Sequence, residues 1–149
     1  GRRCQHYPEI QHAGKTALLI DDYGHHPVEL KATLSALRGA YPEKRMVLIF
    51  QPHRYTRTRD LFDDFVSVLS DVDQLIITEV YPAGEKPIAL ADGRALVRAI
   101  RLQGNENAIF AEDIVDAKRK LFNILQQDDL VVTMGAGSVG KLPAMLNND

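Results

Sequence analysis

The feature that most constrains the fold is a set of five short apolar runs, most of them continuous. The runs lie at residues 17–20, 46–50, 75–80, 108–111 and 130–134. A strand that is covered on both faces has this pattern, because neither row of its side chains meets water. Segments with helical spacing lie between the runs, and strands that alternate with helices join through right-handed crossovers. The sequence therefore predicts an α/β fold, a mostly parallel sheet flanked by helices.

Each of the four predicted helices combines an apolar stripe with a start or stop signal. Pro27 is favoured in the first turn of the first helix, and Thr58 and Asp60 are start signals for the second. We expect Gly104 to stop the third helix and Asp113 to cap the fourth. The stripes are Leu30, Leu34 and Leu37; Leu61, Phe62, Phe65 and Leu69; Leu96, Val97 and Ile100; and Val115, Leu121 and Leu125.

A further strand is predicted at residues 4–10, ahead of the first apolar run. Ala13 and Gly14 form a turn that joins it to residues 17–20. Because this connection is too short for a crossover, we expect the pair to be antiparallel. Cys4 has no histidine partner at a suggestive spacing, and we expect it to be a buried small apolar residue.

Composition and charge exclude several classes of protein. The chain has 149 residues, 45% apolar and 26% charged, which fits a single globular domain. A formal net charge of -2 offers no basic field for nucleic acid or anionic lipid, and one cysteine excludes an intramolecular disulfide. No apolar run approaches the ~20 residues that span a bilayer, and the amino terminus lacks the apolar stretch of a signal peptide. We therefore expect a cytoplasmic protein without nucleic-acid or membrane partners.

Four polar loops, rich in glycine and proline, follow four of the apolar runs. They lie at residues 21–27, 51–59, 81–85 and 135–140. In open α/β sheets, ligands bind beyond the carboxyl ends of the strands. The sequence therefore predicts that the four loops meet at one edge of the sheet and form the functional site there.

The loop at residues 51–59 is a dense cationic cluster, with Arg54, Arg57 and Arg59 beside His53. It precedes or opens a helix, whose amino end also favours anions. Arg54 and Arg57 are three residues apart, so on a helical turn both guanidinium groups suit one carboxylate or phosphate. The alternative is a solvated charged turn in which the arginines pair with neighbouring acidic residues, Asp60, Asp63 and Asp64.

The loop at residues 21–27 carries Asp21, Asp22, His25 and His26. A carboxylate here suits the hydroxyls of a ribose, and histidine can bind or carry protons near neutral pH. Adjacent histidines rarely reach one ion together and the usual ligand spacings are absent, so we expect no metal site. In the alternative interpretation, Asp22 and His25 satisfy backbone groups of the turn and cap the next helix.

Two apparent nucleotide-binding motifs do not hold. Gly14, Lys15 and Thr16 resemble the end of a phosphate-binding loop, but Glu9 stands where that loop needs a glycine. Residues 135–140 fit the spacing G-x-G-x-x-G, yet only nine residues follow, too few for a second strand and a ribose-binding acid. A tight turn from strand to helix explains these glycines equally well.

Several segments together resemble the carboxy-terminal domain of the Mur ligases, bacterial enzymes of cell-wall synthesis. The segments are residues 19–27 (LIDDYGHHP), 50–58 (FQPHRYTRT) and 79–85 (EVYPAGE), flanked by Gly1-Arg2-Arg3 and Gly135-Ala136-Gly137. The resemblance covers essentially the whole chain in the right order. The arginine loop favours the alanine-adding branch over the related branch that recycles murein tripeptide.

The resemblance implies an ATP-dependent, amide-forming ligase of peptidoglycan biosynthesis with three domains. One domain binds the UDP-sugar, a central domain carries the P-loop, the magnesium sites and most catalytic residues, and this Rossmann-like domain is the third. ATP phosphorylates the carboxylate of UDP-N-acetylmuramate, and the amine of L-alanine attacks the acyl phosphate. Because residues 1–149 contain neither of the other two domains, we assign no certain catalytic residue and expect the chain to be inactive alone.

The same resemblance implies roles for particular residues. Arg3 would contact the phosphates of ATP, and Asp22 the hydroxyls of its ribose. The residues that would line the L-alanine site are Tyr23, His25, His53, Arg54 and Arg57. Two other classes of function remain open: a free-standing nucleotide-binding module that uses the loop beginning at Gly135, and a small anion-binding interaction domain built around the two arginines.

Overall fold

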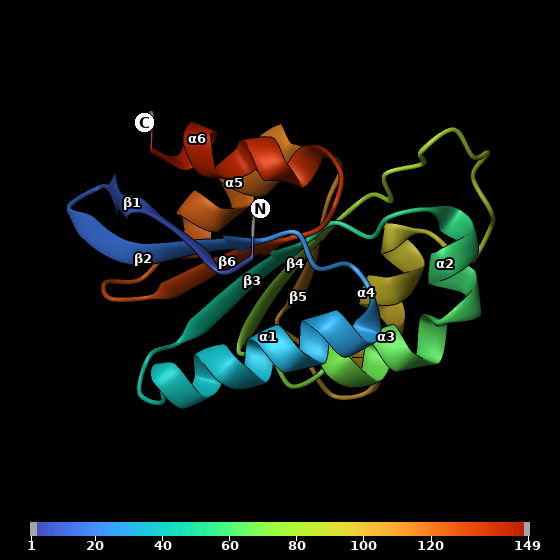
Figure 1. Cartoon of the computed structure of the whole chain (residues 1–149), viewed down its shortest axis with the longest axis horizontal. Helices are drawn as coiled ribbons and strands as arrows, with labels where there is room; N and C mark the ends of the chain where they lie inside the picture. The colour runs from blue at the N-terminus through green and yellow to red at the C-terminus, as the bar shows by residue number, and fades with distance from the viewer. Residues whose placement is uncertain (1–2, 148–149) are drawn as a thin grey trace.

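The computed structural model describes residues 3–147, which form one six-stranded sheet between two layers of helices (Figure 1). The order across the sheet is β1-β2-β6-β3-β4-β5, and all neighbouring strands are parallel except β1 and β2. The predicted fold class, including the antiparallel pair, is confirmed. The strands are β1 (Gln5–His12), β2 (Lys15–Asp22), β3 (Met46–Phe50), β4 (Gln74–Thr78), β5 (Ala108–Ala111) and β6 (Leu130–Met134).

The helices divide between the two faces of the sheet, as Figure 1 shows. In β3, Leu48 and Phe50 pack toward one helical layer, and Val47 and Ile49 pack toward the other. Both rows of side chains are fully buried, which explains the continuous apolar runs. One layer holds α1 (Pro27–Ala40), α3 (Phe62–Leu69) and α4 (Gly93–Leu102), and the other holds α5 (Ile114–Ile124) and α6 (Leu142–Leu146).

The hairpin between β1 and β2 turns at Ala13 and Gly14, both with positive φ. Lys15 therefore begins a strand, so the segment is not a phosphate-binding loop. The expectation that Cys4 is buried was wrong: its side chain is exposed. It lies in a bend just before β1, where its backbone N–H donates to Asp22 Oδ2 over 3.1 Å. Gly1 and Arg2 of the amino-terminal motif lie outside the described residues.

Helix boundaries follow the predicted signals at most ends. Pro27 occupies the first turn of α1, and Asp113 caps α5 by accepting from Asp116 N. The expected start signals Thr58 and Asp60 were wrong, because both lie inside an earlier helix, α2 (Tyr55–Asp60). The chain turns at residue 61 before α3 begins, without a side-chain cap.

The last elements of the fold follow β6. After β6 comes a short 3₁₀ helix, η1 (Ser138–Lys141), which leads directly into α6. The predicted turn from strand to helix is therefore confirmed. Among residues 3–147, no helix combines the length and the apolar character that a membrane crossing requires.

Candidate functional site at the carboxyl edge of the sheet

The loops that follow β2, β3, β4 and β6 meet at one edge of the sheet (Figure 1). These four strands are parallel and adjacent, so their carboxyl ends point the same way. The ring centroids of His25 and His53 are 5.5 Å apart, which joins the first loop to the second. Gln51 Nε2 donates to Ser138 Oγ over 2.8 Å, which joins the second to the fourth. The predicted convergence is confirmed.

The backbone of the loop after β3 is held in an unfavourable conformation at Arg54. This residue has φ 74° and ψ 134°, in a region that costs residues with a side chain on the order of 1–3 kcal/mol. Arg54 N donates to Tyr81 O over 2.8 Å, and Tyr81 N donates to Pro52 O over 2.8 Å. Strain of this kind persists where surrounding contacts impose it, and it is concentrated at functional sites. The geometry thus singles out Arg54 independently of its charge.

Arg57 and His53 form a pair that fixes the protonation state of the imidazole. Arg57 Nη1 donates to His53 O over 3.1 Å and lies 3.1 Å from His53 Nδ1. Because a guanidinium only donates, Nδ1 accepts, and the ring proton of a neutral His53 is on Nε2. Burial lowers the pKa of His53, and the nearby positive charges of His25, Arg57 and Arg54 lower it further. The site therefore presents two permanent cations beside a neutral imidazole.

Neither Arg54 nor Arg57 forms an ion pair within the described part of the chain. Among residues 3–147, no carboxylate lies within salt-bridge distance of Arg54 or Arg57. The alternative of a solvated, self-paired turn holds only for Arg59, whose Nε donates to Asp60 Oδ1 over 2.9 Å. The predicted cluster thus divides into one paired arginine and two that remain available to an anion.

Asp22 is fully buried and organises the turn after β2. Its Oδ1 accepts from Gly24 N over 2.7 Å, and its Oδ2 accepts from Cys4 N over 3.1 Å and from Thr33 Oγ1 over 3.3 Å. Arg3 Nε lies 3.4 Å from the same Oδ2, with a half-exposed side chain. The proposal from sequence that Asp22 satisfies backbone groups therefore describes what this carboxylate does in the structure.

The cap of α1 belongs to a neighbouring residue. His26, not Asp22 or His25, accepts from Val28 N, so the second half of that interpretation was wrong. Glu29 Oε1 in turn accepts from the backbone N–H groups of His25 and His26, over 3.1 and 3.0 Å. Burial opposes ionisation of Glu29, but these two hydrogen bonds together with the charges of His25 and Arg3 outweigh it and hold its pKa below the usual value. This capping box fixes the position of His25 at the rim of the site.

The remaining predicted residues lie at the same edge. The guanidinium of Arg3 lies 5.2 Å from the ring centroid of Tyr23, whose side chain is 38% exposed. The structure therefore divides the predicted site residues into two adjoining groups. Arg3, Asp22 and Tyr23 form one group, and His25, His53, Arg54 and Arg57 form the other.

Sequence reasoning missed the contribution of Tyr81. The loop that contains it was identified, but the residue was given no role. Its ring stacks on that of His53, with centroids 5.5 Å apart and planes inclined by 13°. Glu85, in the same loop, accepts from both Thr56 N and Thr56 Oγ1 and so fixes the start of α2. An aromatic residue directly after an apolar run was the available signal.

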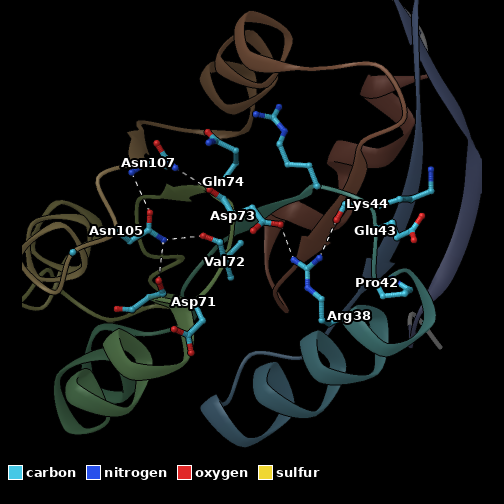
Figure 2. A pocket seen from close by; sticks show the side chains of 13 residues that line it. Arg38, Pro42, Glu43, Lys44, Asp71, Val72, Asp73, Gln74, Asn105 and Asn107 are labelled. Carbon is cyan, nitrogen blue, oxygen red and sulfur yellow. Dashed lines mark hydrogen bonds and ion pairs between the residues drawn. The ribbon is translucent and has the colours of Figure 1, made fainter.

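Two other kinds of site bear on ligand binding, a metal site and a second pocket. Among the described residues, no group of three or more histidine, cysteine or acidic side chains is arranged to hold a metal ion. A polar hollow of about 680 Å³ lies at the opposite, amino edge of the strands (Figure 2). Its side chains bond to its own loops: Arg38 Nη2 donates to Asp73 Oδ2 over 2.7 Å, and Asn105 Nδ2 donates to Val72 O over 2.9 Å. These polar groups are therefore already hydrogen-bonded within the fold.

Comparison with known proteins decides the family. The family model for the Mur ligase, glutamate ligase domain, matches residues 2–137. The chain belongs to the Mur ligase family. The resemblance inferred from the motifs is thereby confirmed.

Individual relatives narrow the comparison. UDP-N-acetylmuramate–L-alanine ligase of Neisseria meningitidis is 63% identical over 147 residues, which cover 98% of this chain and 31% of the relative. The chain thus spans about a third of the length of the relatives it matches. The structure of UDP-N-acetylmuramate–alanine ligase from Thermotoga maritima superposes with a TM-score of 0.72 at 22% identity, covering 97% of this chain and 29% of that one. A murein peptide ligase from Psychrobacter arcticus gives 0.70 at 17% identity, with 99% and 30% covered. At these identities the two Mur ligase structures support the fold alone.

Proposed function

We propose that residues 1–149 are the carboxy-terminal domain of an ATP-dependent ligase that joins L-alanine to UDP-N-acetylmuramate, and that this domain binds the alanine. The observation that carries the proposal is the pair Arg54 and Arg57, which no carboxylate of the described residues neutralises, beside neutral His53. The 63% identity to an alanine-adding ligase supports the choice of amino acid.

The arrangement suits a free amino acid. Its carboxylate accepts charge-assisted hydrogen bonds from the guanidinium groups of Arg54 and Arg57, which hold the molecule in one orientation. Tyr23 and His25 follow the carboxyl end of β2 at the same edge, and we assign them to the surroundings of its amine and side chain. A positioned amine reacts as if at very high local concentration, because binding has already restricted its motion.

The reaction that this geometry serves is amide formation through an acyl phosphate. ATP phosphorylates the carboxylate of UDP-N-acetylmuramate, the alanine amine attacks the acyl phosphate, and the tetrahedral intermediate releases phosphate. Arg3 would contact the phosphates of ATP and Asp22 the hydroxyls of its ribose. The second contact requires Arg3 and Cys4 to move aside, because both contact the fully buried carboxylate of Asp22.

The other components of the reaction belong to the rest of the parent protein. The described residues offer no cluster for magnesium, so we assign that ion to the P-loop domain. The UDP-sugar is assigned to a third domain, and closure of the three would exclude water from the acyl phosphate. We place the ligase in the bacterial cytoplasm, where ATP and the nucleotide sugar are available.

A free-standing nucleotide-binding module is less well supported. The glycine loop at residues 135–140 leads into a 3₁₀ helix of four residues, not into a long helix whose amino end could face a pyrophosphate. Gln51 and Tyr81 also occupy the space beside Gly137. Structures from the murein-tripeptide branch share the fold at 17 and 21% identity, whereas an alanine-adding ligase is 63% identical to this chain.

Kinetics of the full-length ligase test the proposal. Arg54→Ala and Arg57→Ala should each raise the KM for L-alanine, losing about 1.5–3 kcal/mol of binding, because each removes a hydrogen bond to a charged group. Arg59→Ala is the matched control, since its guanidinium pairs with Asp60. Wild-type KM in both site variants would remove the pair from the amino-acid site. The 149-residue chain alone should form no product, and turnover by it would contradict the assignment of catalysis to other domains.

A further inference from the structure

The glycine loop after β6 has no ligand role in the proposed site, yet its backbone approaches that site closely. A Cβ added to Gly137 would lie 2.5 Å from Tyr81 Cγ, 2.8 Å from Tyr81 Cβ and 2.7 Å from Gln51 Oε1. Real side chains do not approach so closely, so only glycine permits Tyr81 to lie where it does. The loop is thus shaped to receive this ring.

The loop is itself fixed to the end of β3. Gln51 is 5% exposed, and its amide spans the gap between the two loops. Gln51 Nε2 donates to Ser138 Oγ over 2.8 Å, and Gln51 Oε1 accepts from Val139 N over 2.9 Å. The glycine loop against which Tyr81 packs is therefore fixed by two hydrogen bonds with the buried side chain of Gln51.

On its other side, Tyr81 contacts His53. The two rings stack with centroids 5.5 Å apart and planes inclined by only 13°. The backbone of Tyr81 also bonds to the residues on either side of His53, since its N–H donates to Pro52 O and its carbonyl accepts from Arg54 N. His53 in turn lies 3.1 Å from the Arg57 guanidinium. One continuous set of contacts thus runs from Gly137 through Tyr81 and His53 to Arg57.

We propose that Tyr81, held in place by the side-chain-free surface of Gly137, is the positioning residue for the His53–Arg57 pair. The proposal rests on the proposed function, because the pair is there assigned to the amino acid. Stacking fixes the plane of the imidazole, so that Nδ1 faces Arg57 and limits the rotamers open to the guanidinium. Tyr81 thereby determines where an incoming carboxylate is bound.

Two substitutions break this set of contacts at different points. Gly137→Ala pushes the ring of Tyr81 away, and since Gly137 has φ −101°, alanine there meets no left-handed backbone penalty. Tyr81→Ala removes the ring itself and tests the same idea if the first variant does not fold. Gly39→Ala is the matched control, because nothing lies within 4 Å of a Cβ on that residue of α1. Tyr81→Phe keeps the stacked ring.

Nuclear magnetic resonance of the 149-residue chain measures the pKa and the tautomer of His53, which report on its surroundings without any assay of activity. In the native chain, the ring of His53 should titrate below the usual histidine pKa, with its neutral form protonated at Nε2. In Gly137→Ala and Tyr81→Ala, the titration should move toward the ordinary value and the two tautomers should mix. Gly39→Ala and Tyr81→Phe should retain the native titration. A native titration and tautomer of His53 in both disruptive variants would overturn the positioning role.

The same variants in the full-length ligase link position to function. Gly137→Ala and Tyr81→Ala should raise the KM for L-alanine roughly tenfold, because a displaced Arg57 guanidinium forms a weaker charge-assisted hydrogen bond with the carboxylate. The KM for ATP should not change, and Tyr81→Phe should recover the native KM for alanine. If the resonances of His53 move while the KM for alanine stays native, the assignment of the pair to the amino-acid site is overturned, and the positioning role stands.

Discussion

Substitution of Asp22 by asparagine separates two roles for this carboxylate, a ligand of ribose and an organiser of the turn after β2. Asparagine has nearly the same shape, but one of its two polar atoms is a donor. Asp22 receives backbone N–H groups on both oxygens, from Gly24 at 2.7 Å and from Cys4 at 3.1 Å. Whichever way the amide is oriented, one of these N–H groups then faces another donor.

The loss can be estimated from the contacts. If asparagine keeps its oxygen on Gly24, the hydrogen bond from Cys4 is lost, and a bond to a charged group contributes about 1.5–3 kcal/mol. The hydroxyl of Thr33 can rotate and accept from the amide, so that contact is retained. Arg3 is half-exposed, so solvent screens its ion pair with Asp22 and the loss of that pair adds little. Asp22→Asn should therefore destabilise the chain by about 2–3 kcal/mol.

Urea unfolding of the 149-residue chain in the absence of nucleotide measures this loss. Asp71→Asn is the control, because Asp71 is exposed and such surface changes usually stay within about 0.5 kcal/mol. Equal unfolding midpoints for the two variants would refute the structural role. The hydrogen bonds of Asp22 would then contribute no stability to the fold, and of its two proposed roles only the binding of ribose would remain.

Two further predictions concern parts of the fold away from the site. Arg45→Ala leaves the Asp129 carboxylate, which is 1% exposed, without its bidentate partner, and should lower the free energy of unfolding by about 3 kcal/mol. Arg38→Ala breaks an ion pair whose side chains are about 40% exposed and should lower it by under about 1 kcal/mol. Equal losses for the two variants in urea unfolding would contradict the argument from burial. The backbone N–H of Glu112 lowers the pKa of Asp116 from 3.8 to about 2, so this carboxylate stabilises the fold fully above pH 3.8 and loses that effect as the pH falls toward 2. Asp116→Asn should therefore flatten the acid limb of the stability curve, and an unchanged curve would show that the shift has another origin.

The strands of the parallel sheet and the edge that carries the site can be read from the amino-acid sequence. The predicted runs at residues 46–50, 108–111 and 130–134 coincide with β3, β5 and β6. A strand between two helical layers must be apolar at every position, and that requirement can be read from a few consecutive residues. Once the strands are parallel, their following loops must meet at one edge, so the convergence of Asp22, His25, Arg54 and Arg57 followed from order along the chain.

The partners of each side chain at that edge depend on contacts between segments that are distant in the sequence. Arg59 pairs with Asp60 while Arg57 contacts His53, although the two arginines are only two residues apart in the sequence. Gln51 bonds to Ser138, 87 residues away, and through that contact the glycine loop reaches Tyr81. Partners of this kind are selected by distance in space, and composition and periodicity report only on near neighbours in the chain. Local patterns therefore fixed where the strands and loops lie, and packing between distant segments fixed which charges are neutralised and which remain available to bind.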